Sequence, residues 1–172
     1  MNFPDAAIVA IGSNLGNSVD IVSSAIERLR GLSDEPLLAS SLYQTEPVDC
    51  PPGSPPFTNA VVALEPRHGE TADSLLTRLQ SLEQEFGRQR SGSRNEARTL
   101  DLDLIAFGSE VRSGPALTLP HLRAHQRAFV LAPLSEIAAN YVLPLQTQSV
   151  KALLATLSGQ TGGVRRLDKS RS

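Results

Sequence analysis

The chain has 172 residues, which is enough for one well-buried core and short for two, so we expect a single domain over residues 1–172. Its formal net charge of -2 excludes a global electrostatic attraction to nucleic acid or membranes. The one cysteine, Cys50, excludes an internal disulfide framework, and no apolar run is long enough for a membrane span or an export signal. We therefore expect a soluble cytoplasmic protein without a membrane or nucleic-acid partner.

The N-terminal segment reads as strand, turn and helix. Residues 6–11 form a continuous apolar run that ends at Gly12, which predicts a buried strand. Residues 19–29 carry apolar side chains at helical spacing, with Asn17 or Ser18 available as the N-terminal cap. The glycine-rich turn between these segments lacks a P-loop lysine, and we interpret it as a plain turn.

The middle of the chain predicts further strands and a second helix. Residues 37–43 and 57–64 read as strands, separated by a proline-rich loop that is too long for a tight hairpin. An apolar stripe predicts a helix from about Thr71 to Gly87. The apolar run at 101–107 then predicts a fourth strand.

The C-terminal part is expected to add smaller elements. These are a small hairpin over 108–119, helices over 125–131 and 150–157, and a charged tail at 165–172 that should fray. The order strand, helix, strand, strand, helix, strand is that of an α+β, ferredoxin-like βαββαβ sandwich, here with an added hairpin and C-terminal helices. Such a fold does not fix function, which must come from the site.

The most informative stretch places Asp101 and Asp103 at i, i+2 in an otherwise apolar strand. Side chains alternate across a strand, so both carboxylates should share one face while Leu102, Leu104 and Phe107 pack around them. Two neighbouring carboxylates repel each other, and a hard divalent cation that also binds phosphate relieves that repulsion. The pattern favours a metal site, although two solvated aspartates on a strand edge are the alternative.

An arginine-rich loop directly precedes this strand. It holds Arg88, Arg90, Arg94 and Arg98 among glycine and serine residues. Because guanidinium groups bind phosphate oxygens bidentately, cation and arginines together suit a polyphosphate ligand. Solvated arginines paired with surface acids are the alternative.

Several segments, in this order, resemble one known family across nearly the whole chain. They are Ala10-Ile11-Gly12-Ser13-Asn14-Leu15-Gly16, Ser41-Leu42-Tyr43-Gln44-Thr45, Asn59-Ala60-Val61-Val62-Ala63-Leu64-Glu65, Gly87-Arg88, Arg98-Thr99-Leu100-Asp101-Leu102-Asp103 and Leu119-Pro120-His121. Together they resemble 6-hydroxymethyl-7,8-dihydropterin pyrophosphokinase, a folate-pathway transferase. The resemblance implies ATP-dependent transfer of a diphosphate to the hydroxymethyl oxygen of the pterin, with release of AMP.

The resemblance also implies a role for individual residues. It implies that Asp101 and Asp103 hold two Mg²⁺ ions, and that Asn59 hydrogen-bonds a pterin ring stacked between Phe57 and Phe129. Backbone groups near Thr45 and Val48 complete pterin recognition in this family. The nucleotide-side and phosphate-side positions correspond to Gln80, Glu83, Arg88, Arg90, Arg98, Leu104, Thr118, His121 and Arg127. No dedicated base is evident, so positioning and charge neutralisation by Arg88, Arg90, Arg98 and the metal site should supply most of the rate.

The chain departs from the family pattern at a few positions. Asn95-Glu96-Ala97 replaces a common Trp-Gly-Pro before Arg98, Glu46 replaces a proline, and Ala116 falls where an arginine often lies. A catalytically weakened member that still binds pterin or ATP is therefore the alternative. A sugar-nucleotide transferase lacks its nucleotide domain in so short a chain, and an RNA binder lacks its aromatic strand motif. We expect small-molecule substrates and a monomer.

Overall fold

The computed structural model describes residues 2–46, 52–87, 99–157 and 163–167, and at its centre lies a six-stranded sheet. The strands are β1 (Ala7–Ser13), β2 (Leu38–Ala39), β3 (Tyr43–Thr45), β4 (Phe57–Leu64), β5 (Asp101–Phe107) and β6 (Val164–Arg166). Their order is β5-β1-β4-β3-β6, and β2 also pairs with β4. Every pairing is antiparallel.

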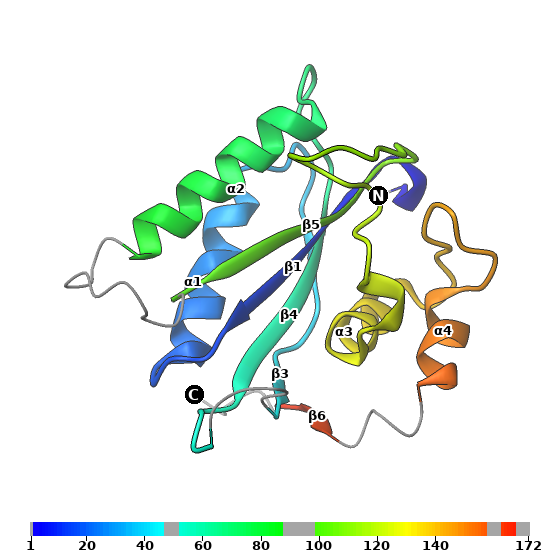
Figure 1. The fold of residues 1–172 in the computed structure, drawn as a ribbon. Helices are drawn as coiled ribbons and strands as arrows, with labels where there is room; N and C mark the ends of the chain where they lie inside the picture. The colour runs from blue at the N-terminus through cyan, green and yellow to red at the C-terminus, as the bar shows by residue number, and fades with distance from the viewer. Residues whose placement is uncertain (1, 47–51, 88–98, 158–162, 168–172) are drawn as a thin grey trace.

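Helices cover both faces of this sheet. The helices are α1 (Ser18–Arg30), α2 (Ala72–Gly87), α3 (Ala128–Ala138) and α4 (Val150–Thr156). Figure 1 shows α1 and α2 on one side of the sheet and α3 and α4 on the other. The predicted α+β sandwich is confirmed, and its C-terminal helices form a third layer. None of the helices in the described ranges is long and apolar enough to cross a membrane.

The central strand β4 explains why both faces are buried. Ala60, Val62 and Leu64 pack in the core under α1 and α2, whereas Val61 and Ala63 pack in the core under α3 and α4. A strand that is covered on both faces is apolar throughout instead of alternating with polar residues. This is why residues 60–64 read as one apolar run.

The sequence predicts one strand over residues 37–43, and this prediction is wrong in detail. The structure has two short strands, β2 and β3, with an interruption between them. β2 and β3 both pair with β4, but the register shifts by one residue between them. At the shift the Ser40 hydroxyl, in place of a backbone carbonyl, accepts the N–H of Val61 at 3.0 Å. The backbone after Ser40 is thereby released from the sheet ladder.

The helix and tail at the C-terminal side also differ from prediction. α3 begins at Ala128 instead of residue 125, because residues 124–126 form a 3₁₀ turn and Arg127 is extended. It continues past Pro133 to Ala138. The predicted hairpin over 108–119 closes on one backbone bridge, between Arg112 and Leu119.

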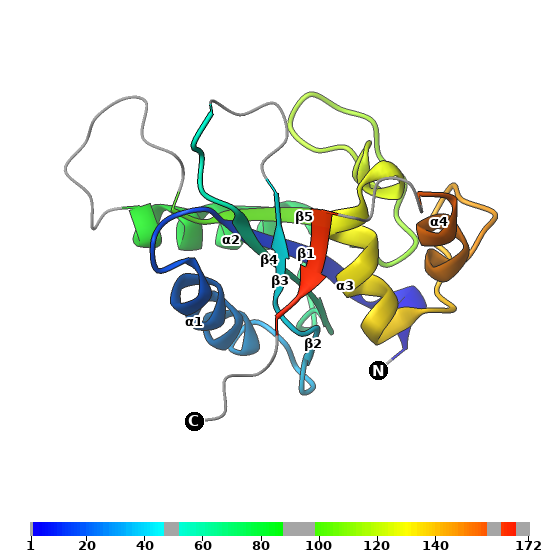
Figure 2. The same ribbon diagram turned by 90° about the horizontal axis from the view of Figure 1, so that it is seen from below.

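The sequence predicts a frayed tail from residue 165, but the ordered chain continues beyond that residue. Arg165 and Arg166 lie in β6, which pairs with β3 and gives this part of the backbone hydrogen-bond partners. Figure 2 shows β6 beside β3 at the edge of the sheet. Residues 168–172 lie outside the described residues.

Candidate active site

The paired aspartates lie on the sheet face that carries α3. Asp101 and Asp103 alternate along β5 with Leu102 and Leu104, which are buried in the core under α1 and α2. The predicted common face is therefore present, but the leucines do not surround the carboxylates. Phe107 packs against the same core as the leucines, because a bulge between the Ile8 and Val9 pairings shifts the register. Asp103 is exposed and Asp101 half-buried, so desolvation of the pair is smaller than an apolar setting implies.

The register of β5, β1 and β4 places Asp101, Gly12 and Asn59 side by side in one row across the sheet. Gly12 of β1 lies opposite Asp101 on one side and Asn59 of β4 on the other. A side chain on Gly12 would place its Cβ 3.0 Å from the Asn59 Oδ1 atom. Glycine at this position of β1 thus leaves room for the Asn59 amide of the neighbouring strand β4.

This row forms one wall of a cavity of about 280 Å³. That volume is near the lower end of the range typical of small-molecule sites, about 300–1,000 Å³. The lining residues are Ala10, Ile11, Gly12, Thr45, Glu46, Phe57, Asn59, Asp101, Asp103, Arg127 and Phe129. Predicted metal-side and pterin-side residues, which are far apart in the sequence, therefore share one cavity.

A buried amide is held in place at the end of the cavity away from the aspartates. The Asn59 Nδ2 atom donates to the Thr45 Oγ1 atom at 2.7 Å. Both residues are almost fully buried, at 7% and 6% exposure. A buried amide with a fixed partner has a defined orientation, so its remaining donor and acceptor positions are pre-set for a ligand.

Two phenylalanines flank this end of the cavity. Phe57 begins β4, and Phe129 lies in the first turn of α3 with an exposure of 37%. The guanidinium carbon of Arg127 lies 5.4 Å from the centre of the Phe129 ring. Arg127 therefore lines the same cavity as the two aspartates, with its charge against the Phe129 ring in a cation–π contact.

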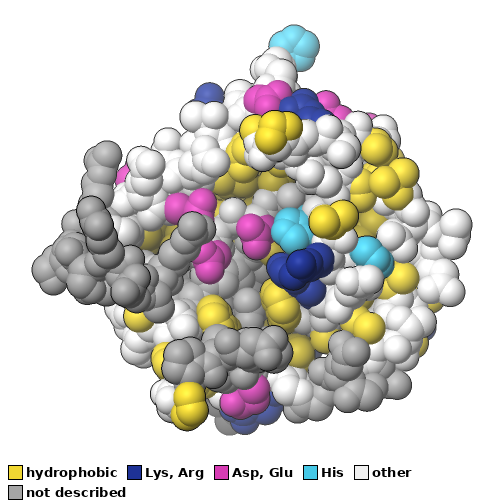
Figure 3. All heavy atoms as spheres, viewed as in Figure 1, with side chains coloured by type: hydrophobic (Ala, Val, Ile, Leu, Met, Phe, Trp, Pro, Cys, Tyr) yellow, Lys and Arg dark blue, Asp and Glu magenta, His cyan; other side chains and the backbone are white. Residues whose placement is uncertain are grey.

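His121 lies beside the acidic end without lining the cavity. Its backbone N–H donates to the Ile105 carbonyl at 2.8 Å, and its Nδ1 atom accepts the N–H of Arg123 at 3.2 Å. Burial lowers the pKa of the imidazole, while the negative charge of Asp103 partly opposes that shift. Figure 3 shows acidic, histidine and basic side chains next to one another at the centre of this face. A mainly neutral imidazole near a carboxylate is a hydrogen-bonding group at physiological pH.

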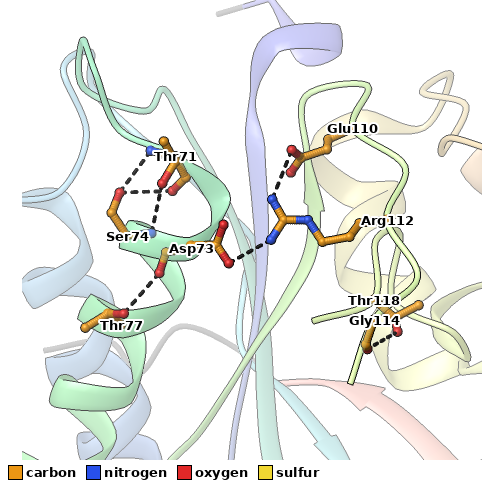
Figure 4. Close-up of polar contacts among 8 residues, drawn as sticks. All are labelled: Thr71, Asp73, Ser74, Thr77, Glu110, Arg112, Gly114 and Thr118. Atoms are coloured by element: carbon orange, nitrogen blue, oxygen red, sulfur yellow. Dashed lines mark hydrogen bonds and ion pairs between the residues drawn. The ribbon is translucent and has the colours of Figure 1, made fainter. Parts of the chain in front are cut away.

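An ion-pair link ties the segment that carries Thr118 to α2. Arg112 contacts Asp73 at 2.7 Å and Glu110 at 3.2 Å (Figure 4). Arg112 also pairs through its backbone with Leu119, directly after Thr118. The Thr118 hydroxyl donates to the Gly114 carbonyl at 3.5 Å. Thr118 thus belongs to a segment that is anchored to α2, but it is not among the cavity-lining residues.

Other predicted nucleotide-side residues lie outside the cavity. Gln80 and Glu83 of α2 line a separate hollow of about 420 Å³ with Thr99 and Leu100. The Glu83 Oε2 atom accepts the N–H of Leu102 at 3.4 Å, between the two aspartates in sequence. The Leu104 side chain is buried in the core under α1 and α2, so only its backbone is available to a ligand on the other face.

The predicted site residues and the residues that line the cavity overlap only in part. Arg88, Arg90, Arg98 and Val48 lie outside the described residues. Sequence reasoning did not assign Ala10, Ile11, Gly12 or Glu46 to the cavity. The position of Gly12 at the end of a predicted buried strand was a usable signal, since a glycine in a strand often marks a site where a ligand or another part of the chain approaches the backbone closely.

Carboxylates, an arginine and two phenylalanines line one cavity, a combination of residue types that suits a transferase with an anionic donor and a planar acceptor. Residues 8–139 match the family model described as 7,8-dihydro-6-hydroxymethylpterin-pyrophosphokinase (HPPK). The chain belongs to this family. The predicted family and its reaction, ATP-dependent pyrophosphoryl transfer to hydroxymethyldihydropterin in folate synthesis, are confirmed by this match and by the relatives.

The relatives include bacterial proteins of similar length. The chain is 40% identical over 139 residues to a Haemophilus influenzae 2-amino-4-hydroxy-6-hydroxymethyldihydropteridine pyrophosphokinase, which covers 80% of this chain and 84% of the relative. It is 39% identical over 137 residues to the Pseudomonas aeruginosa protein of the same name, which covers 79% and 82%. An Arabidopsis thaliana folate synthesis bifunctional protein is 32% identical over 93% of this chain, but only 32% of that relative is covered.

Solved structures share the fold. A Plasmodium falciparum HPPK-DHPS structure matches with a TM-score of 0.72 and 13% identity, over 94% of this chain and 48% of that one. The chain thus spans about half the length of this fused protein. At this identity the match concerns the fold alone.

Proposed function

We propose that the pyrophosphoryl transfer takes place in the cavity between β5 and α3, with Asp101 and Asp103 as the metal-binding residues. The observation that carries this proposal is that both aspartates line the same cavity as Asn59, Phe57 and Phe129. Reaction requires donor and acceptor to lie within contact distance, and one shared cavity meets that requirement.

Two Mg²⁺ ions are part of the proposal, since the side chains present suit them. Within the described ranges there is no cluster of three or more His, Cys, Asp or Glu residues that could enclose a metal ion. Mg²⁺ is usually held by one or two carboxylates together with substrate phosphates, which matches a pair of partly exposed aspartates. When bound, the ions would neutralise the triphosphate and make the acceptor hydroxyl more acidic.

The acceptor end suits a flat heterocycle with polar edges. Phe57 and Phe129 offer aromatic faces for stacking, and a stacked ring is worth about 0.5–1.5 kcal/mol beyond its buried area. The Asn59 amide, fixed by Thr45, offers a donor and an acceptor to the ring edge. Val48 would add a backbone contact to the same ring.

The donor end uses cationic and neutral hydrogen-bonding groups. Arg127 would bind a phosphate oxygen, and His121 would hydrogen-bond beside Asp103. Arg88, Arg90 and Arg98 would neutralise charge that develops toward AMP. Gln80, Glu83, the Leu104 backbone and Thr118 would complete the nucleotide side from α2, β5 and the segment before His121.

The deciding experiment incubates the protein with Mg²⁺, ATP and 6-hydroxymethyl-7,8-dihydropterin and quantifies AMP and the diphosphorylated pterin. We expect the two products in equal amounts, with none when Mg²⁺ is removed by a chelator. Absence of AMP at all metal concentrations would refute transfer by this chain. Calorimetry then identifies a catalytically weakened member, which would bind pterin or ATP without turnover.

The substitution at position 116 is the described feature that favours a weaker donor site. Ala116 is exposed and offers no charged group where an arginine is common in the family. Of the other two departures, Asn95-Glu96-Ala97 lies outside the described residues and Glu46 lines the cavity. A cytoplasmic location, a monomeric state and a single domain stay predictions.

A further inference from the structure

A carboxylate of α3 is engaged by several donors at the interruption between β2 and β3. The Glu136 Oε2 atom accepts the backbone N–H of Ser41 at 2.9 Å and the Tyr43 hydroxyl at 2.9 Å. Its Oε1 atom accepts the Ser41 hydroxyl at 2.6 Å and lies 3.7 Å from the Arg166 guanidinium. These contacts join α3 to the strands β3 and β6.

The interruption in the strand is what makes this docking possible. In a continuous strand, backbone donors alternate between the two neighbouring strands. Ser40 bonds Val61 in both directions, with its backbone N–H as donor at 2.9 Å and its hydroxyl as acceptor, and the N–H of the next residue, Ser41, donates to Glu136 on α3. A local irregularity of the sheet thereby becomes an anchor point for the helix.

Charges reinforce the contacts around this carboxylate. Burial raises the pKa of the Glu136 carboxyl, but the hydrogen bonds from Ser41 and Tyr43 and the charge of Arg166 outweigh burial and lower it overall. Burial and the hydrogen bond to Glu136 raise the pKa of Tyr43 to about 12. The glutamate is thus ionised and the tyrosine a neutral donor at physiological pH, as this hydrogen bond requires.

The same contacts connect the two sides of the acceptor slot. Tyr43 lies opposite Asn59 in the sheet, and Thr45, on the same strand face, holds the Asn59 amide. Glu136 follows Phe129 by seven residues, which is about two helical turns, so both side chains lie on the same side of α3. The carboxylate therefore links the helix that carries Phe129 to the strand that carries Thr45.

We propose that Glu136 is a positioning residue for the acceptor half of the pocket, acting through Tyr43 and Ser41 on the separation between Phe129 and the Thr45–Asn59 pair. Glu136 is not among the residues that line the cavity, so its effect on the ligand is indirect. The inference rests on the proposed function, because it assigns the flat pterin ring to this slot. It predicts a selective effect on pterin affinity, since the anchor lies at the end of the pocket away from Asp101 and Asp103.

The test compares Glu136→Gln and Tyr43→Phe with a matched control, Glu27→Gln. Glu27 is an exposed glutamate of α1 that pairs with Arg30 in its own helix. In Glu136→Gln we expect the KM for the pterin to rise about tenfold, with kcat and the KM for ATP within about twofold of wild type. Tyr43→Phe removes one hydroxyl and should raise the same KM about threefold, whereas Glu27→Gln should change nothing.

The double variant Tyr43→Phe/Glu136→Gln provides the second measurement. If the two side chains act as one unit, its pterin KM equals that of Glu136→Gln instead of the product of the single effects. An unchanged pterin KM in both single variants, or equal rises for pterin and ATP, would overturn the inference. Wild-type enzyme without turnover would instead refute the proposed function, so the two failures are distinguishable. Should Glu136→Gln not fold, the Tyr43→Phe result alone decides.

Discussion

The two ends of the cavity differ in how the protein holds them. At the acceptor end, Asn59 and Thr45 are buried and hydrogen-bonded to each other. At the acidic end, Asp103 is exposed, and within the described ranges no hydrogen bond or ion pair engages its carboxylate.

Under the proposed function, this difference separates pterin binding at one end of the cavity from the chemistry at the other. Buried polar groups must find partners within the protein, so the acceptor end is organised before any ligand arrives. The exposed carboxylate of Asp103 is solvated by water and remains available for a cation that arrives with the phosphates. Substitutions at the acidic end should therefore lower the rate without loss of fold, whereas those at the acceptor end should change affinity and stability together.

The largest effect is expected at the acidic end, from Asp103→Asn. Loss of a metal-binding charge should lower kcat by about a hundred- to a thousandfold, the usual cost of removing one group that stabilises charge in a transition state. The melting temperature should stay within a few degrees, because this side chain is exposed. AMP release and circular dichroism on the same samples measure both. Glu35→Gln, an exposed acid elsewhere, is the control, and near-normal turnover in Asp103→Asn would exclude a metal-binding role.

At the acceptor end, Asn59→Ala should act mainly on affinity. The variant loses the amide and leaves the Thr45 hydroxyl without its partner, so the pterin KM should rise about a hundredfold. Stability should fall by about 1–3 kcal/mol, the usual cost of an unsatisfied buried polar group. Steady-state kinetics and urea unfolding measure the two effects. Asn140→Ala, at an exposed asparagine, serves as control; equal losses for ATP and pterin would argue against an acceptor site here.

A smaller effect is expected from Gly12→Ala, at the boundary between the two ends. The added Cβ would lie 3.0 Å from the Asn59 Oδ1 atom, so the amide must move. We expect about a tenfold rise in the pterin KM, from a shift of a few tenths of an ångström. Gly16→Ala is the matched control, since nothing lies within 4 Å of a Cβ at that position. Identical kinetics for the two variants would show that the close approach at Gly12 has no role.

The smallest effect is the pH dependence of stability at Glu136. Its pKa is lowered in the folded protein, so its ionised form contributes stability that is full above the unfolded pKa and lost as the pH falls through the folded pKa. Glu136→Gln should thus melt about 2–4 °C below wild type near pH 7, with the difference vanishing in acid. Melting curves from pH 3 to pH 7, with Glu27→Gln alongside, test this. A difference that is constant with pH would mean that the charge of Glu136 does not matter.

The sequence was most informative where one local rule dominates. The strand at 57–64 and the start of α2 near Thr71 follow from the apolar pattern, and both match the structure. The interruption at Ser40 was not predictable, because it depends on a side-chain hydrogen bond to a strand that lies later in the chain. The β6 pairing of Arg165 and Arg166 was missed for the same reason, since charged residues at a chain end resemble a solvated tail.

The sequence by itself determined the family, the alternation that sets Asp101 and Asp103 on one face, and the residue types of a pterin pyrophosphokinase site. These follow from local periodicity and from motifs, which need no knowledge of distant contacts. Only the tertiary structure decided which of those residues share one cavity. Strand register placed Gly12 between Asp101 and Asn59, and the Glu136 contacts fixed α3 across from β3, because register and helix docking depend on pairings between segments far apart in the chain.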